Sequence, residues 1–568
     1  MVFDRILFLF AFLLLIPSAI YIPNPGCVEL VQPFNLLFAA GSALLMAACW
    51  RSVLLRRVVI TPTCRALALA FALLALPVLF TRPEWQSAAL WRLAALCAGV
   101  AFYFTWLQVR MTARQRHQVL YMILLTALVQ AVMVLLQLFV PNTADAWVSP
   151  GTSPAFGIFQ APNVTASFLA TGLALALAAF ALPGFRMAQP NAERWRRRLL
   201  AACLILLSAV VVLVQSPAGW LSGGLVVLLF VICFYRRVSQ TVMRALALVV
   251  TGAGVAVLVL MFGDSGSGTL QYNDPAGSIH TRYTVLHDTL AMIIQKPLLG
   301  WGYGGFEYSF QHFRVTQTPA TVPGEIVRHP HSELLLWWVE GGLVALLGIL
   351  VLFRAGVTVV VRARWRDRLM WAGHKAAAGE ALALCLALLP MVLYTQPDSP
   401  FYLSTLHWLV FLFLAAMLDR MVSRRLGPAI SLKGWRYPIL GLALAMLFMA
   451  GAGFYSGQVL KLAERDGGRD RQQAEPLPGW INWIHTERMA FDCQQAALRE
   501  FNHTGDEQLL ESYAQWAQLY LSKHVDKNVY ANLLTILRRQ QQFVRADELR
   551  REAAQLFPYD RRFTRYGF

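Results

Sequence analysis

Histidine and arginine side chains gather in one long polar stretch, residues 278–342, of a chain that is otherwise mostly apolar. His331 and Arg282 have the types needed for chemistry, because an imidazole takes up a proton near neutral pH and a guanidinium binds anions such as phosphate. Arg314 and Arg328 add positive charge to the same stretch. A long segment of this kind is usually functional or disordered. We therefore expect a reaction site here, with a base and an anion contact.

Two other chemistries fit this stretch less well. His329 and His331, followed by Glu333 and Glu340, could suggest a metal, but the HExxH and CxxC spacings typical of zinc sites are missing. The glycine run at 300–305 lacks the GxxxxGK[ST] spacing of a phosphate-binding loop, which favours a tight turn. We expect neither a metal nor a cofactor.

The elements that must position these residues are helices. Arg282 and Leu286 lie one turn apart on a helix predicted over 278–295. Apolar residues with helical spacing form a stripe on it that we predict to pack in the core or on the membrane surface, not to bind a cofactor. The stripe consists of Ile279, Tyr283, Leu286, Leu290 and Ile293 or Ile294. Glu340 lies inside the next apolar segment, 333–353, where a carboxylate needs a cationic partner, such as Arg282.

Composition places the chain in a membrane. It is 57% hydrophobic and 14% charged, with a mean hydropathy of +0.51. A water-soluble domain does not bury that much apolar side chain, so we expect an all-α, polytopic transmembrane bundle. With roughly 20 residues per span, about thirteen segments qualify. They are 4–22, 33–50, 64–80, 88–107, 118–140, 165–183, 199–215, 219–234, 243–262, 333–353, 378–395, 402–420 and 436–455.

Arginines alternate between the loops of this bundle. The short loops 23–32, 141–164 and 396–401 contain no Lys or Arg, whereas the loops between them are basic. The positive-inside rule then puts the N-terminus in the cytoplasm, and the loop at 263–332 and the C-terminus outside. The net charge of +18 fits contact with anionic lipid better than nucleic acid. Cys27 and Cys493 would face the oxidising side, where a bridge between them is possible.

A second polar segment precedes the span at 165–183. Gln160 and Asn163 lie in the motif FQAPN, followed by small and hydroxylated residues. One interpretation is a span that begins after Pro162, with Asn163 as its N-cap and small residues for close helix packing. The other is that Gln160 and Asn163 face a polar cavity, because polar groups at membrane depth are costly and usually functional. The sequence leaves both open.

After the last span the composition becomes that of a soluble domain. We divide the chain into transmembrane helices at 1–262, a catalytic loop at 263–332, further spans at 333–455 and a small helical domain at 456–568. Two helices, 529–542 and 544–557, have the pattern of one tetratricopeptide-like hairpin. One such unit does not form a solenoid, so we expect it to dock on the membrane part or on a partner.

These motifs, in this order, resemble those of the O-antigen ligase and polymerase superfamily. The resemblance rests on FQAPN at 159–163, Arg282-x-x-x-Leu286, PLLGWG at 297–302 and HPHSE at 329–333. The segment 400–408 and the helical tail resemble the protein-modifying branch, the PglL-type O-oligosaccharyltransferases that glycosylate pilins.

The resemblance implies a donor glycan on undecaprenyl diphosphate, a Ser or Thr hydroxyl of a protein such as a pilin as acceptor, and no metal. It makes His331 the general base and Arg282 a diphosphate contact. Where the family has Ser-Arg this chain has Ser216-Pro217, so Arg314 or Arg328 could substitute. Where the family has Asn after the base, it has Ser332. Gln160, Asn163 and Glu340 complete the predicted donor contacts.

Other functions remain open. An O-antigen ligase acting on lipid A-core, or a repeat-unit polymerase, would use the same chemistry on another acceptor. A polysaccharide transporter would place charged residues along a pathway at mid-membrane depth, but here the polar residues gather at the ends of spans. The glycan, the modified protein and the oligomeric state are not predicted.

Overall fold

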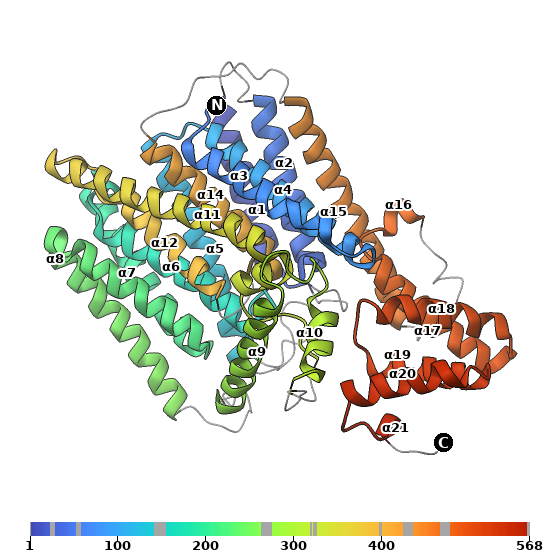
Figure 1. Ribbon diagram of the computed structural model, residues 1–568. Coiled ribbons are helices and arrows are strands. Elements are labelled where there is room, and N and C mark those ends of the chain that lie inside the picture. The colour runs from blue at the N-terminus through green and yellow to red at the C-terminus, as the bar shows by residue number, and fades with distance from the viewer. Residues whose placement is uncertain are drawn as a thin grey trace. The chain divides into compact units, whose positions relative to one another are not determined.

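In a computed structural model, the structure describes residues 2–22, 29–52, 58–140, 155–262, 275–317, 321, 326–396, 400–423, 436–465 and 478–564. The regular elements of these ranges are α-helices and short 3-10 helices (Figure 1). Nine of the described helices are long and apolar enough to cross a membrane. The predicted class, a polytopic all-helical membrane protein, is confirmed. The number of spans and their orientation stay predictions.

The chain folds into two compact units. The first unit comprises residues 1–68, 97–273 and 351–454, and the second comprises 69–96, 274–350 and 455–568. Four helices pass from one unit into the other: α3 (Pro62–Ala75), α4 (Gln86–Gln108), α11 (Glu333–Ala372) and α15 (Arg436–Arg465). The predicted boundaries at 262, 332 and 455 separate segments along the chain, whereas the units group segments by packing.

The first unit is a helical bundle. Its complete helices are α1 (Val2–Ala19), α2 (Pro33–Ser52), α5 (Ala113–Phe139), α6 (Pro162–Ala181), α7 (Pro190–Leu213), α8 (Pro217–Phe262), α12 (Glu380–Tyr394), α13 (Pro400–Leu403) and α14 (Thr405–Val422). Helix α6 lies at its centre, packed by α5, α7, α8 and α12 (Figure 1). Almost every side chain of α6 is buried, since an apolar helix without a polar face belongs inside a bundle.

Small residues let the helices around α6 approach closely. A Cβ added at Gly172 would lie 2.4 Å from the Cβ of Ala127, and one at Gly219 would lie 2.4 Å from that of Ala166. Such contacts replace the hydrophobic driving force that is missing between helices in lipid. The small residues after FQAPN therefore serve close helix packing, as one of the two interpretations of this segment predicted.

Helix α8 consists of two arms that fold back at Val238, whose backbone (φ −141°, ψ 48°) is not helical. A Cβ at Gly223 would contact Val211, and one at Gly252 would contact Ser208, so both arms face the same turn of α7. In a straight helix Gly223 and Gly252 would be about 43 Å apart.

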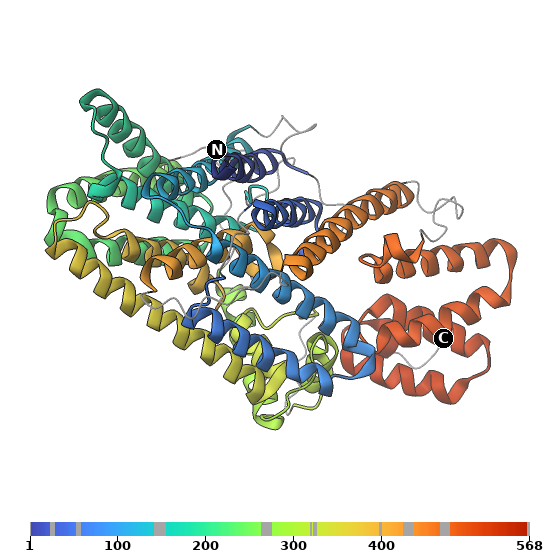
Figure 2. The same cartoon turned by 90° about the horizontal axis from the view of Figure 1, so that it is seen from above.

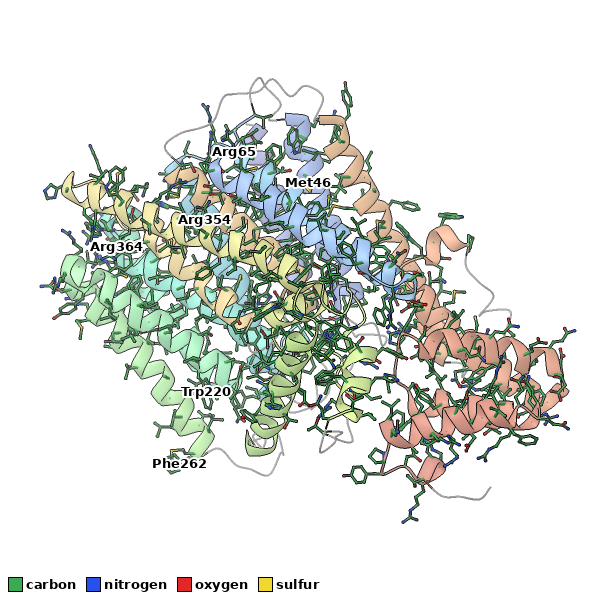
Figure 3. The ribbon with its side chains drawn as sticks, viewed as in Figure 1. Met46, Arg65, Trp220, Phe262, Arg354 and Arg364 are labelled. Carbon is green, nitrogen blue, oxygen red and sulfur yellow. The ribbon has the colours of Figure 1, made fainter. Side chains whose placement is uncertain are left out.

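The fold-back is visible from the ends of α8. Figure 3 shows Trp220, near the start of the helix, and Phe262, at its end, on the same side of the bundle. The two arms coincide with the two segments, 219–234 and 243–262, that the sequence separates at this place.

The second unit joins a loop to the C-terminal domain. Its complete helices are α9 (Pro275–Gln295), α10 (Phe306–Val315), α16 (Gly479–Asn482), α17 (Thr486–Thr504), α18 (Glu507–Leu521), α19 (Lys527–Arg539), α20 (Phe543–Leu556) and α21 (Arg561–Thr564). Helices α17 with α18 and α19 with α20 form hairpins around one hydrophobic core (Figures 1 and 2). The predicted hairpin of the tail is confirmed.

Candidate active site

The Glu340 carboxylate is the centre of a buried polar cluster in the second unit. It accepts hydrogen bonds from the backbone N–H groups of Gly304, at 3.0 Å, and Phe306, at 3.2 Å. It also pairs with the Arg92 guanidinium of α4. The side chains of Glu340 and Arg92 are only 1% and 12% exposed. A buried carboxylate with a cation and two amide donors is satisfied, so Glu340 holds α4, the 296–305 loop and α11 together.

Arg92, not Arg282, is therefore the cationic partner of Glu340. The Arg92 guanidinium also lies over the rings of Tyr303 and Trp337, at 5.5 and 5.3 Å from their centroids. A guanidinium between two aromatic faces keeps its charge while the rings exclude water. The expectation that Glu340 pairs with an arginine is confirmed, and the suggested partner was wrong.

The 296–305 loop meets α11 backbone to backbone. Helix α11 is broken at Gly342 (φ 61°, ψ −155°), and the amide of Leu343 donates to Pro297 of the loop at 2.9 Å instead of to its own helix. A Cβ at Gly342 would lie 2.3 Å from the carbonyl oxygen of Leu298, and one at Gly300 would lie 2.4 Å from that of Glu340. Both glycines are required by this approach.

The rest of the glycine run packs on Trp85. A Cβ at Gly305 would lie 2.3 Å from the indole ring, and one at Gly302 would lie 3.3 Å from it. The run therefore makes a tight turn against α11 and Trp85, as the sequence favoured over a phosphate-binding loop.

His331 stands at the end of this assembly, two residues before α11. Its side chain is exposed, and its backbone has φ = 53°. A positive φ costs free energy in a residue other than glycine and is often found at functional sites. Ser332, which is buried, follows it and accepts a hydrogen bond from the N–H of Leu335 at 3.4 Å. Ser and Asn are both good N-cap residues, so the Ser in place of the family's Asn keeps the cap.

Arg282 lies on α9 with an exposed side chain. The predicted helix is confirmed. Tyr283, Leu286, Leu290 and Ile294 are exposed, so most of the stripe does not pack in a protein core, and its predicted contact with the membrane surface stays a prediction. Of that stripe, only Ile293 is buried, and the side chain of Ile279 lies outside the described residues.

Arg314 fixes α10 to α9. Its guanidinium is 1% exposed, and its Nε donates to the Asp288 carboxylate of α9 at 3.2 Å. Thr321 donates to the same carboxylate at 2.7 Å. Burial lowers the pKa of Arg314, and the Asp288 charge opposes that effect. This arginine is held inside the unit, with one nitrogen, Nη1, lacking a hydrogen bond within the described residues.

Arg328 is exposed and lies 3.8 Å from the Glu307 carboxylate at the start of α10. Glu307 also accepts from His524 Nδ1 at 3.2 Å and from the N–H of Val525 at 3.0 Å. Burial lowers the pKa of His524, but hydrogen bonds to Glu307 and Glu487 outweigh that effect and raise the pKa to about 9. The same contacts lower the pKa of Glu307 against the opposing effect of its burial.

A second contact joins the C-terminal domain to the other end of α10. His312 and Tyr530 both contact the Glu552 carboxylate, at 3.0 and 2.7 Å. Val315 and Ile326 pack against the core of the domain. The tail thus docks on the loop that carries the predicted site.

Gln160 and Asn163 belong to the first unit. Gln160 has φ = 57°, and its Nε2 is buried without a hydrogen bond among the described residues. Asn163 accepts a hydrogen bond from Ser216 Oγ at 2.9 Å. The predicted N-cap is wrong, because α6 starts at Pro162 and its N-cap is Ala161.

Two glutamines of α5 hold the segment before Gln160. Gln137 Oε1 accepts from the N–H groups of Phe156, at 3.0 Å, and Gly157, at 2.8 Å, and its Nε2 donates to the Gly157 carbonyl at 3.0 Å. Gln130 Oε1 accepts from the N–H of Ile158 at 3.2 Å. Non-helical backbone among apolar helices requires such partners, since no water is there to bind it.

The sequence analysis missed these supporting residues, although three of them left a signal. Arg92 is a charged residue inside the predicted span 88–107, and Gln130 and Gln137 lie two turns apart in the apolar span 118–140. A polar residue inside a span usually faces a partner in the protein. The His524–Glu307 contact left no signal, because it joins residues 217 positions apart.

Comparison with protein families gives two matches that fit this architecture. Residues 202–350, which include α9, α10 and the start of α11, match the family described as O-antigen ligase. Over this segment the chain is similar to the O-antigen ligase family. Residues 382–566 match the model described as virulence factor membrane-bound polymerase, C-terminal. A comparison with curated proteins found no match.

The O-antigen ligase family implies a ligase that transfers glycan from a lipid-linked sugar donor. The match covers Arg282, Arg314, Arg328, His331 and Glu340, and ends at residue 350. Cys27 lies outside the described residues, so its suggested bridge to Cys493 stays a prediction.

Proposed function

We propose that this chain, which is similar to the O-antigen ligase family over residues 202–350, transfers an oligosaccharide from undecaprenyl diphosphate to Ser or Thr hydroxyls of proteins, pilins among them, on the periplasmic side of the bacterial inner membrane. His331 is the general base, and Arg282 contacts the diphosphate. The observation that carries the proposal is the setting of His331, exposed at a positive φ directly before α11. Arg282 is exposed in the same compact unit.

The step is a single displacement. The acceptor oxygen bonds to C1 of the first sugar as the bond from C1 to the phosphate oxygen breaks. His331 takes the hydroxyl proton, which in such reactions contributes about 10²–10⁴ in rate. The diphosphate leaves as an anion that Arg282 stabilises by charge-assisted hydrogen bonds. Attack opposite the leaving group inverts the anomeric centre.

Of the other predicted donor contacts, some have exposed or partly exposed side chains and others are buried. Arg328 is exposed three residues before His331 and adds positive charge next to the base. Gln160 and Asn163 are partly exposed at the start of α6 and supply amide groups for sugar hydroxyls. Arg314 and Glu340 are buried and paired, so we assign them to holding α9 and α11 in place.

The test is co-expression of the chain with a pilin and a lipid-linked glycan, followed by intact-mass analysis of the pilin. The proposal predicts a mass increase equal to the glycan, which the His331→Ala chain at equal abundance does not produce. Modified lipopolysaccharide with an unmodified pilin would instead identify a ligase acting on lipid A-core.

A second candidate, glycan polymerisation, is favoured by the match of residues 382–566 to a polymerase C-terminal model. The acceptor would then be a sugar hydroxyl of another lipid-linked glycan. The same experiment separates the two, because a polymerase lengthens the lipid-linked glycan without any acceptor protein.

A further inference from the structure

Helix α9 has one buried face and one exposed face. The buried residues are Val285, Asp288, Thr289, Met292 and Ile293. The exposed face carries Leu286 and Leu290, which are 41% and 39% exposed, and Ile294, which is 78% exposed. An amphipathic helix normally buries its apolar side chains, so exposed leucine and isoleucine on a helix with a separate packing face require another explanation.

Contacts on the buried face of α9 fix the orientation of this helix. Asp288, on the buried face, pairs with Arg314 of α10 at 3.2 Å and accepts from Thr321 at 2.7 Å. Rotating the helix to bury its leucines would expose this carboxylate and leave the Arg314 charge buried without a partner, which is costly. The contacts of Asp288 therefore keep the opposite, apolar face of α9 exposed.

The exposed residues form one row that begins with a positive charge. Arg282, Leu286, Leu290 and Ile294 follow each other at intervals of four residues, so each lies one turn beyond the last on the same side of the helix. The row is about 18 Å long. Leu298, in the turn after the helix, is also exposed.

We propose that this row binds the polyprenyl chain of the donor lipid, with the diphosphate at Arg282. This inference rests on the proposed function and extends it to the lipid part of the substrate. The charges are complementary, because the row offers one cation at one end and only aliphatic side chains beyond it. A polyprenyl diphosphate has the same order, an anionic head followed by a long hydrocarbon chain. Its binding removes the exposed aliphatic surface from water.

The test compares the donor lipid with its head group alone, on the purified full chain in detergent. Binding of undecaprenyl diphosphate and of inorganic diphosphate is measured for the wild type, for Leu286→Ser/Leu290→Ser and for Ile294→Ser, whose side chain is the most exposed of the row. Leu519→Ser, an exposed leucine on α18, is the matched control.

We expect the double variant to weaken undecaprenyl diphosphate binding by roughly tenfold and to leave the binding of inorganic diphosphate, which has no hydrocarbon chain, unchanged. Arg282→Ala should weaken both ligands, because both carry the head group. Equal weakening of both ligands by the leucine variants, or no effect on either, would overturn the inference and leave the row as a bilayer contact. Failure of the proposed acceptor is seen separately, as selective long-chain binding without transfer to a protein.

Discussion

The Arg92 guanidinium of α4 pairs with the Glu340 carboxylate of α11 in the interior of the second unit. Glu340 in turn accepts hydrogen bonds from the backbone N–H groups of Gly304 and Phe306. One ion pair thus fixes the start of α11, the helix that His331 precedes, against a second helix and a glycine-rich turn. We expect the position of the imidazole to depend on it.

Removing one partner of this pair should be strongly destabilising. Arg92→Leu leaves a carboxylate buried without its cation, which typically costs about 3–5 kcal/mol. We expect a lower Tm in detergent and a loss of transfer. The control is Arg92→Leu/Glu340→Leu, which removes both charges and should recover part of the lost Tm. A double variant as unstable as the two single changes combined would contradict a paired role.

The break in α11 at Gly342 should not tolerate a side chain. Gly342→Ala places a Cβ 2.3 Å from the Leu298 carbonyl at φ = 61°, so we expect a severe loss of folded protein. Gly356→Ala, on the same helix with nothing within 4 Å of the added Cβ, should be neutral or slightly stabilising. The measurement is the yield of monodisperse protein with its Tm, and equal yields for the two variants would refute the proposed backbone contact.

The hydrogen bonds of Gln137 should matter for Gln160 and Asn163. Gln137→Leu leaves two N–H groups and one carbonyl of the segment 155–158 without partners, each costing about 1–3 kcal/mol. Donor binding should weaken as the segment shifts. Gln118→Leu, an exposed position on the same helix, is the control. Transfer kinetics identical to wild type in Gln137→Leu would show that the segment does not need these contacts.

The contact between the C-terminal domain and α10 should weaken in base. The pKa of His524 rises from the ordinary 6.5 to about 9, so its contribution is complete below pH 6.5 and disappears as the pH rises through 9. Glu487, whose pKa is lowered from 4.5 to about 2, contributes above pH 4.5 and loses its effect as the pH falls through 2. Hydrogen exchange of α10 amides should therefore accelerate between pH 8 and pH 10, beyond the intrinsic effect of pH.

His524→Gln is the matched variant for this measurement. Because glutamine does not titrate, this variant removes the pH-dependent contribution of residue 524 to the contact with α10. The protection of α10 amides from hydrogen exchange should therefore be lower than in the wild type at pH 7 and should not change further up to pH 10. A wild-type profile that is equally flat would exclude the titration of His524 as the cause.

The sequence predicted features that depend on composition and local period. The helices, the fold-back in α8 and the hairpin of the tail follow from runs of apolar residues, glycine, proline and helical spacing. It failed on features that depend on tertiary partners. The stripe on α9 was predicted to pack in the core or on the membrane surface, because periodicity identifies a face but not what covers it. The buried Asp288 shows that the other face packs against the protein.

Partners far apart in the chain were missed for the same reason. Arg92 and Glu340 are 248 positions apart, and no local pattern joins them. The roles of His331 and Arg282 were predicted from the resemblance of their motifs to a family, whereas the Arg92–Glu340 ion pair required the fold.

Proton removal by His331 is the central step of the proposed transfer reaction. Transfer from glycosylated undecaprenyl diphosphate to an acceptor peptide should be measured under single-turnover conditions for wild type, His331→Ala and His374→Ala, another exposed histidine with a positive φ. We predict a rate about 10²–10⁴ lower for His331→Ala, with donor binding retained, and an unchanged rate for His374→Ala. A His331→Ala chain that folds, binds the donor and transfers at the wild-type rate would contradict the account.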